Sequence, residues 1–73
     1  MFDYSKLRGR IVEKFGSCEA FAKQLNITNV TVSKKLNNKS GFSLEDIILW
    51  TEKLDIHKNE IGVYFFTLKV QAG

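Results

Sequence analysis

The stretch of sequence that decides the fold is AKQLNITNVTVSK, residues 22–34. It predicts two short helices, about 18–25 and 29–37, joined by a tight turn. Ser17 and Thr28 precede these helices, and each hydroxyl can accept an unsatisfied backbone N–H as an N-cap. Asn26 stands where the first helix must stop, and Asn tolerates the left-handed backbone that such a stop usually needs. The stretch therefore predicts a helix-turn-helix unit.

Both helices have an apolar face with which to pack. Phe21 and Leu25 lie one turn apart on the first helix, and Val32 and Leu36 lie one turn apart on the second. Ala22 lies beside the first pair, and its small side chain lets a second helix cross closely. The two helices are therefore expected to pack against one core.

The opposite face of the second helix is mostly polar. Asn can pair with an adenine edge, Ser with several base atoms, Lys with guanine or phosphate, and Val with a thymine methyl. Such a face suits a helix that lies in the major groove of DNA, although an ordinary solvated helix face is the alternative. The predicted base-reading residues are Asn29, Val30, Ser33, Lys34 and Asn37.

The segment from Ser17 to Lys39 resembles the helix-turn-helix of the lambda-repressor-like, Cro/C1-type (XRE) DNA-binding domains. In its small size the chain most resembles a phage Cro-type repressor. It departs from the family pattern at Cys18, where a Gln usually contacts a phosphate, and at Asn26, where Gly is usual. The positions that match the pattern are Ala22, Ile27, Thr28, Thr31, Val32, Ser33 and Leu36.

This resemblance also implies contacts with the DNA backbone. In related domains the loop after the recognition helix lies near the phosphates, and here that loop is polar, from Asn37 to Gly41. An ordinary solvated loop is the equally weighted alternative. Thr31 lies at the border of the polar face, where it suits a phosphate contact or a capping role. The candidate phosphate contacts are Ser17, Cys18, Thr31, Asn38 and Lys39.

The charge distribution agrees with a phosphate-facing surface. The net charge is +3. Residues 1–41, which contain the motif, carry eight Lys/Arg against three Asp/Glu, whereas residues 42–73 carry three against five. A basic half of this kind is what nucleic-acid binding requires, with a chance fluctuation as the alternative.

Two further helices flank the motif. A helix over about 4–15 is predicted to begin at an Asp3 cap, to end at Gly16 and to bury Leu7, Ile11 and Phe15. Another opens at Ser43, and its predicted buried stripe is Leu44, Ile47, Ile48, Thr51 and Leu54. Trp50 falls beside that stripe, which places it either under the C-terminal segment or at a dimer interface.

The C-terminal part is the least determined. A short fifth helix over about 58–64 is possible, and the run from Tyr64 to Val70 is rich in strand formers. An isolated strand has no second run in this chain with which to pair. We therefore expect this tail, about 65–73, to fold back over the core beside Trp50, to meet its copy in a second subunit, or both.

The whole chain is interpreted as one domain, residues 1–73, with the motif over about 17–37. The expected fold is all-α, a compact four- to five-helix lambda-repressor-like domain with a short extended tail. The lone Cys18 cannot form an internal disulfide, and no apolar run approaches the roughly 20 residues of a membrane span. The single His57 has no nucleophile or metal cluster nearby, so neither an enzyme, a cofactor, a metal nor a small-molecule ligand is expected.

The leading functional hypothesis is a sequence-specific regulator of transcription that binds double-stranded DNA. It would be a phage or prophage Cro-type repressor, cytoplasmic in a bacterial cell, that occludes an operator as a weak or moderate homodimer. The alternative is the same fold used as a protein-interaction module, the partner of a repressor or toxin. Such a module would tolerate the loss of Lys34, Asn29 and Lys39.

Overall fold

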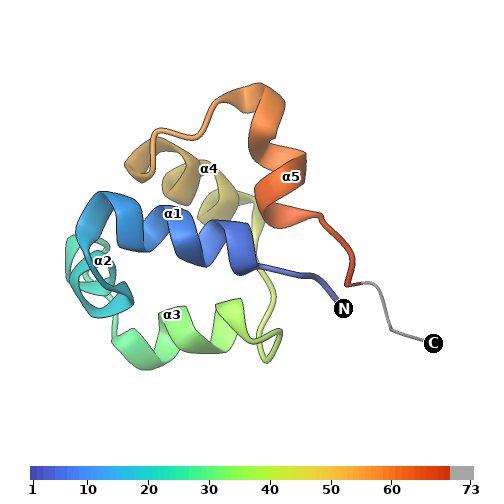
Figure 1. Ribbon diagram of the computed structural model, residues 1–73. Coiled ribbons are helices and arrows are strands. Elements are labelled where there is room, and N and C mark those ends of the chain that lie inside the picture. The colour runs from blue at the N-terminus through green and yellow to red at the C-terminus, as the bar shows by residue number, and fades with distance from the viewer. Residues whose placement is uncertain (70–73) are drawn as a thin grey trace.

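The computed structural model describes residues 1–69 and forms five α-helices around one core. In Figure 1, α1 crosses the middle of the molecule, with α3 below it and α4 above it. No helix in this part of the chain is both long and apolar enough to cross a membrane. The all-α prediction is confirmed. The helices are α1 (Ser5–Phe15), α2 (Cys18–Gln24), α3 (Asn29–Leu36), α4 (Leu44–Lys53) and α5 (Ile61–Phe65), the last preceded by a 3-10 turn (Lys58–Glu60).

The turn between α2 and α3 forms as its residues predict. The Ser17 Oγ accepts the Ala20 backbone N–H at 3.1 Å, and the Thr28 Oγ1 accepts that of Thr31 at 3.2 Å. Asn26 adopts the left-handed conformation, with φ of 58°. Helix α2 ends at Gln24, one residue earlier than expected. Local capping chemistry therefore sets both ends of the turn.

Helix α1 differs from the prediction at its start. It begins at Ser5, and the N-cap position is Tyr4, which makes no side-chain cap. Asp3 acts one residue further out: its Oδ1 accepts the Ser5 backbone N–H at 2.9 Å and the Ser5 hydroxyl at 2.6 Å. The predicted stop is confirmed, because Gly16 has φ of 86° and donates its N–H to the Val12 carbonyl.

Trp50 lies at the centre of the core, where it is 1% exposed. Its ring packs edge-to-face against Phe21 and Phe42, with centroids 4.9 and 4.8 Å apart. Phe42 in turn packs against Phe65 at 5.2 Å. The ring is buried within one chain, so the predicted dimer-interface position is wrong, whereas Phe65 of the predicted tail does lie in the same core cluster. Trp50 instead joins α2 and α4 within one chain.

The predicted buried stripe of α4 is also wrong in part. Trp50 and Leu54 are buried and Ile47 is half-buried, but Leu44 and Ile48 are exposed. The predicted stripe and the observed one both have helical spacing. The stripe with Trp50 is the buried one, because burying the Trp side chain removes the most apolar area from water.

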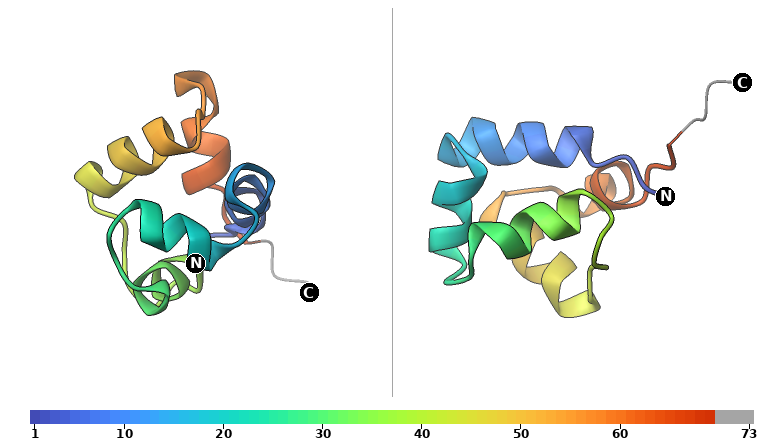
Figure 2. Two further views of the ribbon diagram at one scale, coloured as in Figure 1. Left: turned by 90° about the vertical axis from the view of Figure 1, so that its left-hand side faces the viewer. Right: turned by 90° about the horizontal axis from the view of Figure 1, so that it is seen from below.

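The segment after α5 pairs with the N-terminus of its own chain. The Asp3 N–H donates to the Thr67 carbonyl at 2.7 Å, and the Lys69 N–H donates to the Met1 carbonyl at 3.1 Å. These bonds form an isolated antiparallel bridge between Phe2 and Leu68. Figure 2 shows the N-terminal residues beside this segment. The expectation that the tail has no partner within the chain is wrong, because residues 1–3 supply one.

The predicted bounds of the tail also change. Phe65 is the last residue of α5 and is buried, so the extended segment begins at Phe66 rather than at residue 65. The predicted fifth helix is confirmed in position, as the 3-10 turn and α5 together cover residues 58–65. The rest of the predicted tail, residues 70–73, lies outside the described residues.

Candidate nucleic-acid interface

The outward face of α3 brings the five predicted base-reading residues together. Val32 and Leu36 turn into the core and hold the helix with its other side toward solvent. Val30 is 62% exposed, although its side chain is apolar. With Lys39 from the following loop, the predicted residues line one shallow hollow: Asn29, Val30, Ser33, Lys34 and Asn37.

These side chains differ in whether hydrogen bonds within the protein fix them. The Asn37 Nδ2 donates to the Ser33 Oγ at 3.1 Å, and Arg8 donates to the Asn37 Oδ1 at 3.4 Å. Asn29 and Lys34 make no side-chain hydrogen bond within residues 1–69, so their polar atoms are free to bind a ligand. The face thus has a fixed end at Asn37 and a free end at Asn29.

Two basic residues without an ion pair to the described residues lie on this face. Three basic residues of the N-terminal half are already paired: Arg10 with Glu13, Lys14 with Asp55, and Lys35 with Asp46. Lys34 and Lys39 make no ion pair within residues 1–69. An anion that approaches α3 therefore meets two unpaired ammonium groups, which is the arrangement that phosphate contacts use.

The predicted phosphate contacts do not share one environment. The Ser17 hydroxyl caps α2, and the half-buried Cys18 packs against the core. The Thr31 Oγ1 lies 3.0 Å from the Thr28 Oγ1 at the start of α3. Lys39 is exposed beside the hollow. Contacts of these four residues with phosphate stay predictions.

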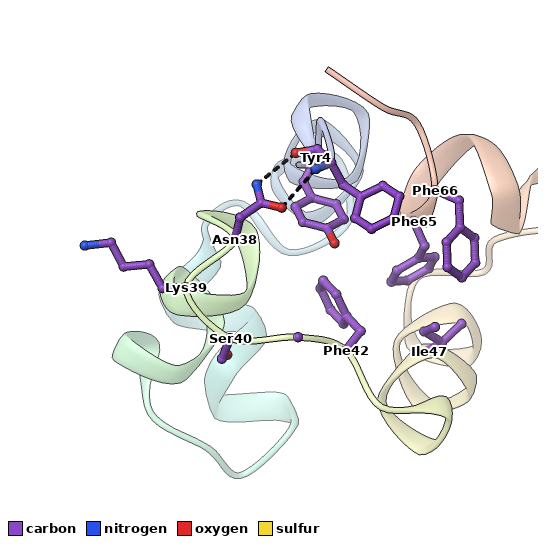
Figure 3. Close-up of a pocket in the computed structure, with 10 residues that line it drawn as sticks. Tyr4, Asn38, Lys39, Ser40, Phe42, Ile47, Phe65 and Phe66 are labelled. Carbon is purple, nitrogen blue, oxygen red and sulfur yellow. Dashed lines mark hydrogen bonds between the residues drawn. The ribbon is translucent and has the colours of Figure 1, made fainter. Parts of the chain in front are cut away.

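Asn38 has a structural role that the sequence did not indicate. Its Oδ1 accepts the Phe2 backbone N–H at 3.0 Å, and its Nδ2 donates to the Phe2 carbonyl at 2.8 Å (Figure 3). Asn38 also has a left-handed backbone, with φ of 61°. Both amide atoms therefore help to hold the N-terminal segment against the end of α3, and a contact of Asn38 with phosphate stays a prediction. The residue type signals a left-handed stop, but nothing local points to a partner 36 positions away.

Lys35 and Asp46 fix α3 relative to α4 and were also missed. The Lys35 Nζ lies 2.8 Å from the Asp46 Oδ2 and donates to the Gly41 carbonyl at 3.1 Å. Asp46 and Ser43 form a reciprocal capping box at the start of α4. Burial raises the pKa of Asp46, but hydrogen bonds from Lys35 and Ser43 outweigh it and hold that pKa below its ordinary value.

Comparison with known proteins places the chain in a family. A family model described as "Protein of unknown function (DUF739)" matches residues 1–68. The chain belongs to the DUF739 family. No curated protein matches the sequence.

A solved structure resembles this DUF739 protein over nearly its whole length. It is the solution structure of the modulator of repression (MOR) of the temperate bacteriophage TP901-1 from Lactococcus lactis. The two sequences are 37% identical, and the match covers 96% of this chain and 95% of that one with a TM-score of 0.80. The narrower assignment of this DUF739 protein to the Cro/C1 type stays a prediction.

Proposed function

We propose that this DUF739 protein is a phage or prophage regulator of repression that binds its target through the exposed face of α3. The observation that carries this proposal is the likeness to a phage modulator of repression, 37% identical over 96% of the chain. The arrangement of α2, turn and α3 supports it, because the turn leaves one face of α3 uncovered. We assign no catalytic activity, metal or cofactor to the chain.

The first candidate target is operator DNA. Asn29, Ser33 and Lys34 carry side chains that can bond to base edges in the major groove, and the exposed Val30 can contact a thymine methyl. Lys39 lies beside them as a phosphate contact. A domain this small would read a near-palindrome as a homodimer, with half-sites roughly 34 Å apart, and would act by occluding the operator.

The second candidate target is a repressor protein. The name of the similar phage protein states that it modulates repression, which an effect on a repressor would explain. The exposed apolar side chain of Val30 among polar neighbours also suits a protein contact. In this version the chain is an interaction module that uses Val30 on the same face and tolerates the loss of Asn29, Lys34 and Lys39.

Selection from a random-sequence duplex library at two salt concentrations tests the DNA candidate. We expect enrichment of a near-palindromic sequence and affinity that falls steeply as salt rises. The Asn29→Ala/Lys34→Ala double variant should lose the enrichment, and the matched control Lys53→Ala at the end of α4 should keep it.

Two other results would each overturn the DNA candidate. Salt-sensitive binding without enrichment would indicate a basic but unselective surface. Absence of binding at low salt would leave the interaction module as the remaining candidate. A separate result, enrichment that survives in the double variant, would refute the role of α3 in DNA binding.

A further inference from the structure

Helix α4 exposes three large apolar side chains, Leu44, Ile48 and Leu49, and the first two form a pair. Leu44 is 73% and Ile48 is 52% exposed, one helical turn apart. Trp50 and Leu54 supply the buried face of the same helix. Neither Leu44 nor Ile48 belongs to the core cluster, and adjacent exposed apolar side chains of this kind can mark an interaction site.

An apolar hollow adjoins this pair. It has a volume of about 330 Å³ and is lined by five aromatic residues and Ile47 together with the polar loop from Asn38 to Gly41, as Figure 3 shows. Ile47 lies three residues from Leu44, so on a helix the two side chains are neighbours. The wall of the hollow therefore continues into the exposed pair on α4, and an aromatic hollow of this kind suits one large apolar side chain.

The charges beside the exposed pair are acidic. At 100° per residue, Glu45 and Glu52 fall on the side of Ile48 that faces away from Ile47. Neither glutamate makes an ion pair within residues 1–69. Residues 42–73 as a whole carry five acidic residues against three basic ones.

These charges favour one kind of occupant. A second copy of this chain that docked through the same face would bring the glutamates of both copies to one interface, where like charges repel. A partner with basic residues beside its apolar side chains would instead find opposite charges along Ile48 and an aromatic hollow beyond Leu44.

We propose that Leu44, Ile48 and the aromatic hollow form a second binding surface, for a basic amphipathic helix of a partner protein. Its apolar side chains lie on Leu44 and Ile48, one of them enters the hollow at Ile47, and its basic side chains pair with Glu45 and Glu52. The surface differs from the α3 face in its residues, although the two hollows meet at Lys39, which lines both. It does not rest on the proposed function.

A pair of synthetic helical peptides tests this surface on the full chain. One carries Leu at positions i, i+3, i+4 and i+7 with Lys elsewhere, and its twin carries Glu in place of Lys. We expect the Lys peptide to bind with a dissociation constant of about 1 mM or lower by fluorescence anisotropy. Leu44→Ser/Ile48→Ser should weaken it about tenfold or more, and Val12→Ser, an exposed apolar position on α1, should not.

The other outcomes overturn the proposal. Equal binding of the Glu peptide would refute the charge argument, and equal binding by the double variant would refute the surface. No binding of either peptide at millimolar concentration would exclude a basic helix as the occupant. A dimer of the parent chain that the double variant abolishes in sedimentation would show that a second copy covers α4. Circular dichroism of each variant confirms that the helices are retained.

Discussion

Helices α3 and α4 are built alike and present different chemistry to the solvent. Each begins at a hydroxyl cap, Thr28 for α3 and Ser43 for α4, and each buries apolar residues at helical spacing. Outside, α3 offers amide, hydroxyl and ammonium groups, whereas α4 offers Leu44 and Ile48 beside unpaired glutamates. Capping and burial decide that a helix forms, and the residues left over decide what it can bind.

Different contacts hold α3 and α4 in the fold. Lys35 joins them at the start of α4 through Asp46, and the Trp50 ring joins α4 to α2 through Phe21. The end of α3 is held by the bonds between Asn38 and Phe2. The comparison therefore separates residues that support the helices from residues that bind partners, and substitutions can test each class.

The largest effect is expected from Trp50→Ala, which removes the ring that joins α4 to α2. The loss of a buried aromatic side chain of this size costs about 3–5 kcal/mol of unfolding free energy. A small domain has about 5–15 kcal/mol in total, so much of its stability would go. Urea unfolding followed by circular dichroism measures the change.

The control on the same helix is Leu44→Ala, which should change the free energy of unfolding by no more than about 0.5 kcal/mol. Equal losses in the two variants would mean that α4 is not oriented as described, with Trp50 inward and Leu44 outward.

The next largest effect concerns the end of α3. Asn38→Gly keeps a residue that adopts φ of 61° and removes only the amide bonds to Phe2. We expect a loss of about 1–3 kcal/mol, because the Phe2 N–H and C=O lose their partners. Asn26→Gly is the matched control, as it also sits at positive φ, and it should be neutral within about 0.5 kcal/mol. Thermal unfolding of both variants shows whether the amide bonds to Phe2 contribute more stability than the left-handed backbone conformation does.

The caps of the two helices should differ by a smaller amount. Thr28→Ala and Ser43→Ala each remove a hydroxyl acceptor, at a cost of about 0.5–2 kcal/mol. Ser43→Ala should be the more destabilising, because Ser43 takes part in a reciprocal box with Asp46 that also receives Lys35. Urea midpoints of the two variants test the order, and a reversed order would show that the box adds nothing.

The smallest effect is a pH dependence confined to α4. Since the folded pKa of Asp46 lies below its ordinary value, the carboxylate stabilises the fold above the unfolded value of about 4. That contribution is lost as the pH falls through the folded pKa. The stability difference between the parent and Asp46→Asn should therefore shrink as the pH is lowered from about 6 to 2. Asp3 and Asp55 also have lowered pKa values, but they are present in both proteins and do not affect the difference. A difference that stays constant with pH would contradict this role for Asp46.

Much of α3 and its surroundings could be predicted from the sequence, because the signals are local. Ser17, Asn26 and Thr28 act on backbone groups within a few residues of themselves, and their residue types report that chemistry. The polar face of α3 follows from helical spacing alone. The five predicted base-reading residues therefore do lie together in the structure, and their contacts with a ligand stay predictions.

The sequence-based predictions were wrong where contacts between distant residues decide the structure. Two helical stripes of α4 fit the spacing equally well, and only the rings of Phe21 and Phe42 select the one that contains Trp50. The amide of Asn38 bonds to Phe2, and the segment after α5 pairs with residues 1–3, only because folding brings these distant residues together. Nothing in the local sequence at these positions identifies the partner.

The central claim is that α3 presents the binding face, and chemical-shift mapping tests it most directly. Backbone and side-chain amide shifts are followed while the duplex with the strongest enrichment in the library selection is added to the full chain. The account predicts the largest shifts at Asn29, Val30, Ser33, Lys34 and Lys39, with residues of α4 unaffected. Shifts that centre on α4 or on the segment after α5, with α3 unchanged, would contradict it.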